Sequence, residues 1–359
     1  MNRHVFFPAV LIIYILVCNV SLATTYNVTD LGALSGTGSY AYGINASGQV
    51  VGYVYTTGNA FHAFFYNGST MNDLGTLVGS DSFAWGINDN GQVVGRAFTT
   101  GDAASHAFLY SGSTVTNLGT LGGTYSEAFG INNSGQVVGV ADTTGDAASH
   151  AFLYSGSTMN DLGALGGTYS VAYGINASGQ VVGKADTVDA YHAFLYDGTT
   201  MNDLGTLGGT YSIAYGINDS GQVVGWTYTT GDYAKHAFLY SGTTMTDLGT
   251  LDRTQSEAYG INASGQVVGT AYNNGYGAQH AFLYSDSTMI DLNTLIDPSS
   301  GWKLVDARDI NDSGQIVGYG YNGSQNHAFL LTPVPEPSTL VFLGSALLGL
   351  SWILLARRR

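Results

Sequence analysis

Three short motifs recur seven times in a fixed order along this chain, and this repetition constrains the fold more than any other feature. Gly-Ile-Asn occurs six times and Asp-Ile-Asn once; the asparagines are Asn45, Asn88, Asn132, Asn176, Asn218, Asn262 and Asn311. His-Ala-Phe and Asp/Asn-Leu also occur seven times each. Residues 25–332 number 308, and 308 divided by seven gives 44 residues per unit. A period of this length indicates propeller blades or a β-solenoid.

Each unit contains four segments that are typical of β-strands. In one unit they cover residues 161–165, 170–176, 180–185 and 192–196. Turns with Ser-Gly or Asp-Gly join the segments and favour hairpins. Apolar runs replace strict alternation, so both faces of each sheet should be covered by neighbours. The sequence therefore predicts an all-β protein, a seven-bladed β-propeller of four-stranded blades, with a β-solenoid as the alternative.

The two ends of the repeat region predict how the ring would close. The chain enters with an Asp-Leu strand that has no His-Ala-Phe strand before it, and it leaves with a His-Ala-Phe strand that has no Asp-Leu strand after it. Each terminal strand lacks the partner that the other can supply. We therefore expect residues 28–31 to pair antiparallel with residues 328–331, which would remove two exposed sheet edges.

The charge and the cysteine content exclude several classes of function. The chain of 359 residues has 25 acidic and 10 basic side chains, a net charge of −15. Phosphate backbones would repel such a chain, so nucleic acid is not an expected partner. The only cysteine, Cys18, lies in the N-terminal apolar segment, which excludes disulfides and thiol catalysis in the mature chain.

Both ends of the chain carry features of protein export. Residues 1–23 combine Arg3, an apolar run over 5–20 and a small-residue site ending at Ala23, which indicates a signal peptide. The C-terminus combines a Pro-Glu-Pro triplet, an apolar run over 340–356 and three arginines; these residues are Pro335, Glu336, Pro337, Arg357, Arg358 and Arg359. The run predicts a transmembrane helix whose basic end stays cytoplasmic.

Two resemblances follow from these motifs. Residues 333–359 resemble the PEP-CTERM sorting signal of Gram-negative bacteria, which implies an inner-membrane intermediate, processing by an exosortase, and delivery to the cell surface or secretion, often within a polysaccharide-rich biofilm matrix. Residues 24–332 resemble the bacterial HAF-repeat proteins, through His-Ala-Phe, Asp-Leu-Gly-Thr-Leu-Gly-Gly at 203–209 and Gly-Ile-Asn-x-Ser-Gly-Gln-Val-Val-Gly at 174–183. That resemblance implies a propeller and no particular activity.

Every histidine of the mature chain belongs to a His-Ala-Phe triplet. They are His62, His106, His150, His192, His236, His280 and His327. Equivalent positions on separate blades lie about 10 Å or more apart, too far to share a zinc ion bound at about 2 Å. We interpret each imidazole as a structural group that bonds a neighbouring blade's backbone or its Asp-Leu aspartate. No metal and no cofactor is predicted.

The loops before each His-Ala-Phe triplet vary most, and in a propeller they would all emerge on one face. They supply candidate ligand-binding residues: Asp102, Asp146, Asp232, Tyr233 and Tyr276. A glycan stacked on Tyr233 or Tyr276 is the first candidate ligand, and simple solvated loops are the alternative. The Asn-x-Ser-Gly turns resemble calcium loops superficially, but they lack spaced carboxylates, so we interpret them as turns.

Few features of the sequence indicate an enzyme. Glu127 and Glu257 occupy the same repeat position, which is unlike an acid and base pair with distinct surroundings. Residues 302–309 form the least repeat-like segment, where an active site would break the symmetry, although a surface ion pair in a closing blade is the alternative.

The leading hypothesis is an exported, non-enzymatic propeller that binds at the cell surface or in the extracellular matrix, with signal peptidase, exosortase and extracellular polysaccharide as partners. The alternative is a glycan-active hydrolase or lyase that uses the rim around the seventh repeat.

Overall fold

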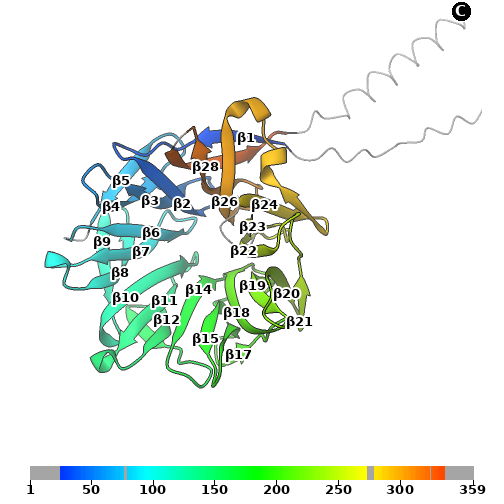
Figure 1. Ribbon diagram of the computed structural model, residues 1–359. Helices are drawn as coiled ribbons and strands as arrows, with labels where there is room; N and C mark the ends of the chain where they lie inside the picture. The colour runs from blue at the N-terminus through cyan, green and yellow to red at the C-terminus, as the bar shows by residue number, and fades with distance from the viewer. Residues whose placement is uncertain (1–24, 77–78, 273–278, 324, 336–359) are drawn as a thin grey trace, which may run out of the picture.

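The computed structural model describes residues 25–76, 79–272, 279–323 and 325–335. These residues form β-strands and four short 3-10 turns, with no α-helix among them, which confirms the all-β prediction. The sheets stand side by side around a central axis, so that the described chain forms a ring (Figure 1). The 3-10 turns are η1 (Thr100–Asp102), η2 (Thr144–Asp146), η3 (Leu292–Thr294) and η4 (Pro298–Ser300).

Five of the sheets contain four strands each. The first three of them comprise β2 (Gly38–Ile44), β3 (Val50–Tyr55), β4 (Phe61–Tyr66) and β5 (Met71–Gly75); β14 (Ser170–Ile175), β15 (Val181–Asp186), β16 (Tyr191–Tyr196) and β17 (Met201–Asp203); and β18 (Gly208–Ile217), β19 (Val223–Thr229), β20 (Lys235–Ser241) and β21 (Thr244–Asp247). The other two comprise β22 (Gln255–Ile261), β23 (Val267–Tyr272), β24 (His280–Ser285) and β25 (Thr288–Asp291); and β26 (Trp302–Ile310), β27 (Ile316–Asn322), β28 (Gln325–Pro333) and β1 (Tyr26–Asp30).

The remaining strands form one sheet of eight. They are β6 (Ser82–Ile87), β7 (Val93–Phe98), β8 (Ser105–Ser111), β9 (Thr114–Gly119), β10 (Gly122–Ile131), β11 (Val137–Thr143), β12 (Ser149–Ser155) and β13 (Thr158–Asp161). Two repeats share this sheet because β10 starts early and pairs in parallel with β8, at Tyr125 and Ser105. The prediction of seven separate four-stranded blades is therefore wrong: the propeller has five four-stranded blades and one eight-stranded sheet.

The terminal strands close the ring. β1 pairs antiparallel with β28, with Val28 opposite Leu331 and Asp30 opposite Phe329, which confirms the predicted pairing. In Figure 1 the two strands lie together at the top of the ring. This contact argues against a solenoid, whose ends would lie far apart.

The core lies between neighbouring sheets and is built from the repeated motifs. The phenylalanine of the His-Ala-Phe triplet is buried in every unit: Phe64, Phe108, Phe152, Phe194, Phe238, Phe282 and Phe329. The glycine of each Val-Val-Gly lets the inner two strands approach closely. At Gly52 an added Cβ would lie 1.9 Å from the Tyr40 carbonyl oxygen, so no larger residue fits there.

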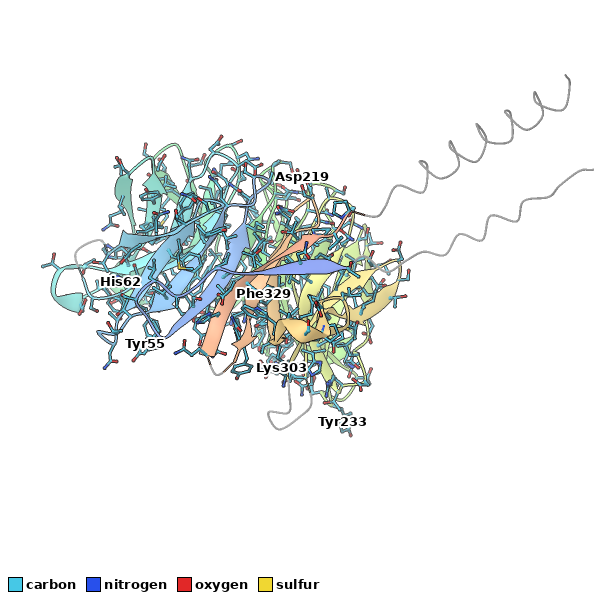
Figure 2. All side chains as sticks on the ribbon, turned by 90° about the horizontal axis from the view of Figure 1, so that it is seen from above. Tyr55, His62, Asp219, Tyr233, Lys303 and Phe329 are labelled. Carbon is cyan, nitrogen blue, oxygen red and sulfur yellow. The ribbon has the colours of Figure 1, made fainter. Side chains whose placement is uncertain are left out.

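A closed ring of hydrogen bonds surrounds the axis at one end of the propeller. The side-chain amide of each repeated asparagine donates to the backbone carbonyl of the asparagine in the next unit, at distances of 3.0–3.3 Å. The last bond runs from Asn311 Nδ2 to the Asn45 carbonyl oxygen, 3.0 Å apart, so it joins the last unit to the first. We call this end the turn face and the opposite end, which carries the irregular loops, the loop face. Figure 2 shows Asp219 on the turn face, with Tyr55, Lys303 and Tyr233 toward the loop face.

The predicted signal peptide (1–23) and the predicted membrane span (340–356) both lie outside the described residues. Within the described part of the chain, no helix has the length and hydrophobicity needed to cross a membrane.

Candidate functional site

Two cavities of about 220 Å³ each follow the propeller axis. Both are lined by the same four isoleucines, which lie where the cavities meet: Ile87, Ile131, Ile175 and Ile217. The cavity on the turn face is polar and is lined by repeated asparagines together with Asp89, Asp219 and Asp312. The cavity on the loop face is lined by aromatic side chains and Arg308. The two mouths therefore differ in chemistry.

Aromatic rings encircle the cavity on the loop face. The residue before each Gly-Ile-Asn is aromatic in six units, and these residues form the aromatic collar: Tyr42, Trp85, Phe129, Tyr173, Tyr215 and Tyr259. Centroids of neighbouring rings lie 4.6–6.3 Å apart. In the seventh unit Arg308 takes this position, and its Cζ lies 4.2 Å from the Tyr259 centroid and 5.1 Å from the Tyr42 centroid. The guanidinium thus completes the circle through cation–π contacts.

A buried ion pair holds Arg308 in place. Its Nη2 lies 2.7 Å from Oδ2 of Asp306, a residue that is 2% exposed. Burial raises the pKa of Asp306, although Arg308 opposes the shift. Asp306 Oδ1 and Arg308 Nε are buried and have no hydrogen-bond partner among the described residues. Of the charged segment predicted at 302–309, Arg308 and Asp309 line the axial cavity, and the pair of Arg308 with Asp306 is largely buried, unlike the surface pair of the alternative interpretation.

Asp309 marks the same break in the symmetry. It replaces the glycine of Gly-Ile-Asn and lines the loop-face cavity. Its carboxylate accepts hydrogen bonds from the backbone N–H of Ile44 at 3.0 Å and of Ile310 at 2.9 Å. Burial nevertheless raises the pKa of Asp309 to about 7. Because Ile44 belongs to the first unit, this carboxyl lies at the closure of the ring.

Two further carboxylates occupy the repeat position of Asp306, and each has a basic partner on the preceding unit. Glu127 Oε1 lies 3.0 Å from Arg96 Nε, and Glu257 Oε1 lies 2.6 Å from Lys235 Nζ. Trp85 Nε1 also donates to Glu127, at 2.7 Å. These pairs neutralise the two glutamates and bind neighbouring units to each other.

A second group of aromatic side chains extends from the collar across the loop ends of β14–β19. We call Tyr169, Tyr191, Tyr211 and Tyr228 the tyrosine band. The Tyr191 and Tyr211 centroids lie 4.6 Å apart, and those of Tyr211 and Tyr228 lie 6.0 Å apart. Lys184 Nζ joins Tyr169 to the others, because it lies 5.2 Å from the Tyr169 centroid and 5.0 Å from that of Tyr191. The band is a continuous aromatic surface at least partly open to solvent, since Tyr169 is 38% exposed.

The predicted loop aspartates lie on the loop face but apart from the axis. Their carboxylates hold neighbouring loops: Asp102 accepts from Ser80 N at 2.9 Å, Asp146 from Thr124 N at 2.8 Å, and Asp232 from Thr210 N at 2.7 Å. Tyr233 projects into solvent with 85% exposure, whereas Tyr276 lies outside the described residues. The structure therefore does not bring these five residues together into one pocket.

The repeated histidines lie near the outer edges of the sheets, each against an Asp-Leu residue. The pairs with aspartate are His62–Asp73, His150–Asp161, His192–Asp203, His236–Asp247, His280–Asp291 and His327–Asp30. In the remaining unit Asn117 Nδ2 lies 2.8 Å from His106 Nδ1. This is one of the two partners that the sequence favoured. No group of three or more potential metal-ligating side chains occurs in the described ranges.

Sequence reasoning missed the aromatic collar, although its signal is visible in the repeat. An aromatic residue precedes Gly-Ile-Asn in six units. In the seventh unit Arg308 precedes the variant triplet Asp-Ile-Asn. Of the predicted sorting residues, Pro335 is described and exposed, while Glu336, Pro337 and the arginines at 357–359 lie outside the described residues.

Comparison with known families identifies the sorting motif at the C-terminus. The PEP-CTERM protein-sorting motif matches residues 333–359. The chain carries a PEP-CTERM sorting signal. This indicates export, processing by an exosortase, and a surface or extracellular location. A second family, described as "Protein of unknown function (DUF3466)", matches residues 206–329, about a third of the chain. Neither match tests the resemblance to HAF-repeat proteins, which stays a prediction, and no curated protein matches the chain in sequence.

Solved structures share the fold at low sequence identity. A puromycin-hydrolyzing peptidase from Mycobacterium tuberculosis is 11% identical, with a TM-score of 0.53, over 86% of this chain and 53% of that one. TolB from Acinetobacter baumannii is 10% identical, with a TM-score of 0.44, over 84% and 65%. A Trypanosoma rangeli sialidase is 11% identical, with a TM-score of 0.38, over 87% and 57%. The chain thus spans less than two thirds of each, and the likeness to the peptidase concerns the fold alone.

Proposed function

We propose that this protein is an exported, non-catalytic propeller that binds carbohydrate on its loop face, at the cell surface or in the extracellular matrix. One observation carries the proposal: aromatic side chains gather on one face. The collar and the tyrosine band both open to the loop face, whereas the turn face is built from one repeated polar turn. The sorting signal supports the location, because it directs the protein out of the cell.

Aromatic rings on a rigid scaffold suit saccharides. A pyranose ring has an apolar face of C–H groups that stacks on tyrosine or tryptophan, while its hydroxyl groups pair with polar neighbours. Most collar residues belong to the innermost strands, each paired antiparallel with the next strand of its sheet, and the band residues lie in or beside β14, β16, β18 and β19, so little ordering is required on binding. A rigid platform of this kind binds without a large entropic cost.

Titration of the mature, exported protein with oligosaccharides tests the proposal. Trp85 lies in the collar, and the ring centroid of Trp226 lies 6.4 Å from that of Tyr191 in the band. Binding should therefore change tryptophan fluorescence. Tyr211→Ala should weaken binding about tenfold or more, because it interrupts the band. Val115→Ala is the matched control, since Val115 is 36% exposed on the outer strand β9. Equal loss in both variants, or no response to any glycan, would contradict a binding site on the loop face.

A polysaccharide-active enzyme is the second candidate, and one observation favours it. Asp306 and Glu257 occupy the same repeat position in adjacent units and each has a basic partner, yet Asp306 is the more deeply buried and its burial raises its pKa despite the pair with Arg308. Glycoside hydrolysis needs two carboxyl groups with unlike surroundings. Release of reducing ends that is abolished by both Asp306→Asn and Glu257→Gln, in variants that remain folded, would favour the enzyme over the binding module.

A further inference from the structure

We propose that the ligand of the loop face is a polysaccharide with free amino groups, which lies along the tyrosine band with its ammonium groups toward neighbouring aspartates. This inference rests on the proposed function and specifies the class of ligand. It commits to a cationic amino-sugar polymer, in preference to a neutral glycan or a polyuronate.

The band offers successive platforms for an extended chain. Ring contacts run from Tyr191 to Tyr211 and from Tyr211 to Tyr228, with centroids 4.6 Å and 6.0 Å apart. The three residues come from β16, β18 and β19, so the platform crosses from one blade to the next. A polymer can place consecutive sugar rings over it, whereas the closed collar can admit only the end of a chain. The band is therefore the surface that suits a polymer.

Three basic groups near the loop-face cavity are already paired, whereas Lys184 contacts the band without an ion pair among the described residues. Arg96, Lys235 and Arg308 each form an ion pair with a carboxylate, at 3.0 Å, 2.6 Å and 2.7 Å. These three groups offer an anionic sugar no uncompensated positive charge, so Lys184 is left as its candidate partner. An acidic polysaccharide would also meet the repulsion of a chain whose net charge is −15. The same net charge attracts a polycation and accelerates its association.

The aspartates beside the band are not compensated in this way. Asp186 and Asp189 lie at and after the loop end of β15, and Asp232 lies in the loop after β19. None of the three has a lysine or arginine within ion-pair distance among the residues that the structure describes, although Asp186 lies close enough to Lys184 to raise the pKa of that lysine. Asp232 accepts hydrogen bonds from Thr210, but its charge remains. The band thus has aromatic platforms beside three carboxylates that lack a direct ion pair, of which Asp186 interacts with Lys184 at longer range.

Lys184 shows that these rings hold an ammonium group. Its Nζ lies 5.2 Å and 5.0 Å from the centroids of Tyr169 and Tyr191, within the range of cation–π contacts. Burial lowers the pKa of Lys184, while the nearby Asp186 opposes the shift. A cationic ligand would therefore compete with Lys184 for the same rings and the same carboxylate. An anionic ligand would need Lys184 as its partner. Substitution of Lys184 therefore distinguishes cationic from anionic ligands.

The experiment compares three oligomers of equal length by calorimetry on the mature, exported protein at low salt. The probes are a deacetylated glucosamine oligomer, its N-acetylated counterpart and an oligouronate. We expect the glucosamine oligomer to bind at least about tenfold more tightly than the other two, with affinity that falls as salt is added. Lys184→Gln should tighten its binding, and Asp186→Asn should weaken it about two- to fivefold. Asp219→Asn makes the same charge change on the turn face and should leave affinity unchanged.

The outcomes separate this inference from the proposed function. Equal or tighter binding of the N-acetylated oligomer would overturn the charge selection and leave a glycan-binding face intact. Preferential binding of the oligouronate, weakened by Lys184→Gln, would overturn the inference in favour of an acidic glycan. No heat and no fluorescence change with any oligomer would overturn both. Because Lys184→Gln retains a long polar side chain, it gives a second reading if Asp186→Asn fails to fold.

Discussion

Replacing Asn311 by alanine should remove a large part of the stability of the propeller. The Asn311 side chain is 6% exposed and makes four hydrogen bonds. Its Nδ2 donates to the Asn45 carbonyl oxygen at 3.0 Å and to Gln315 Oε1 at 2.8 Å. Its Oδ1 accepts from the backbone N–H of Ser313 at 3.1 Å and of Gln315 at 3.0 Å. The side chain therefore shapes its own turn and joins the last unit to the first.

The magnitude follows from the groups that alanine would leave without partners. The Asn45 carbonyl and the two backbone N–H groups would lose their hydrogen bonds, and a buried polar group left unsatisfied costs about 1–3 kcal/mol. Water can reach the turn N–H groups more easily than the Asn45 carbonyl, so we expect a total near the lower end of the sum. The free energy of unfolding should fall by about 3 kcal/mol.

Denaturant unfolding followed by far-ultraviolet circular dichroism measures this loss. Asn160→Ala is the matched control, because Asn160 is exposed and, among the described residues, its Nδ2 donates to the Leu153 carbonyl alone, at 3.2 Å. That control should change stability by less than about 0.5 kcal/mol. Asn88→Ala, at an internal position of the same ring, should resemble Asn311→Ala. A loss below about 1 kcal/mol for Asn311→Ala would refute the argument that the asparagine ring holds the units together.

Three further predictions concern pH, closure and sorting. The pKa of Asp309 is raised from 3.8 to about 7, so between these pH values the folded state retains a proton that the unfolded state loses. The free energy of unfolding should therefore fall by at most about 4 kcal/mol as pH rises from 4 to 7, and it should stay constant above pH 7. The free energy of unfolding of Asp309→Asn, measured at pH 5 and pH 8, should lack this dependence on pH. An unchanged difference between the two pH values would contradict the raised pKa of Asp309. Deletion of residues 24–33 removes β1 and should lower the melting temperature of the whole domain; an unaltered melting curve would contradict closure through β1. Deletion of residues 340–359 should change where the protein accumulates in cell fractions, and unchanged surface delivery would count against the sorting signal.

The repeat motifs predicted most of the strands, because their period and turns are explicit. The predicted segments 170–176, 180–185 and 192–196 correspond within one residue at each end to β14, β15 and β16. The segment 161–165 was misplaced, since β13 runs from Thr158 to Asp161. The Asp161 carboxylate accepts a hydrogen bond from the Gly163 N–H at 2.7 Å and contacts His150. The chain therefore turns out of the sheet after Asp161, the residue at which the sequence predicted a strand to begin.

The sharing of one sheet by two repeats could not be read from the sequence. It depends on one parallel pair between Tyr125 and Ser105, which backbone atoms make and no side-chain pattern announces. The aromatic collar was missed for another reason. A β-bulge lies between Ala41 and Gly43, and equivalent bulges recur in the other inner strands. Because a bulge shifts the alternation of faces, period-two reasoning does not show that Tyr42 faces the axis.

The distribution of constant and variable positions connects the scaffold to its function. The asparagine, the phenylalanine and the histidine of each unit are constant: the asparagine joins neighbouring units, the phenylalanine packs in the core, and the histidine joins two strands of one sheet. The position two residues before the collar varies instead: Tyr40, Phe83, Glu127, Val171, Ile213, Glu257 and Asp306. Since the constant residues already satisfy the packing and hydrogen bonding of each unit, the variable position can change without loss of the fold. It lies toward the loop face, where Glu127, Glu257 and Asp306 set the charge around the axis. A chain with the same motifs but other residues at this position should therefore keep the propeller while the charge around its axis changes.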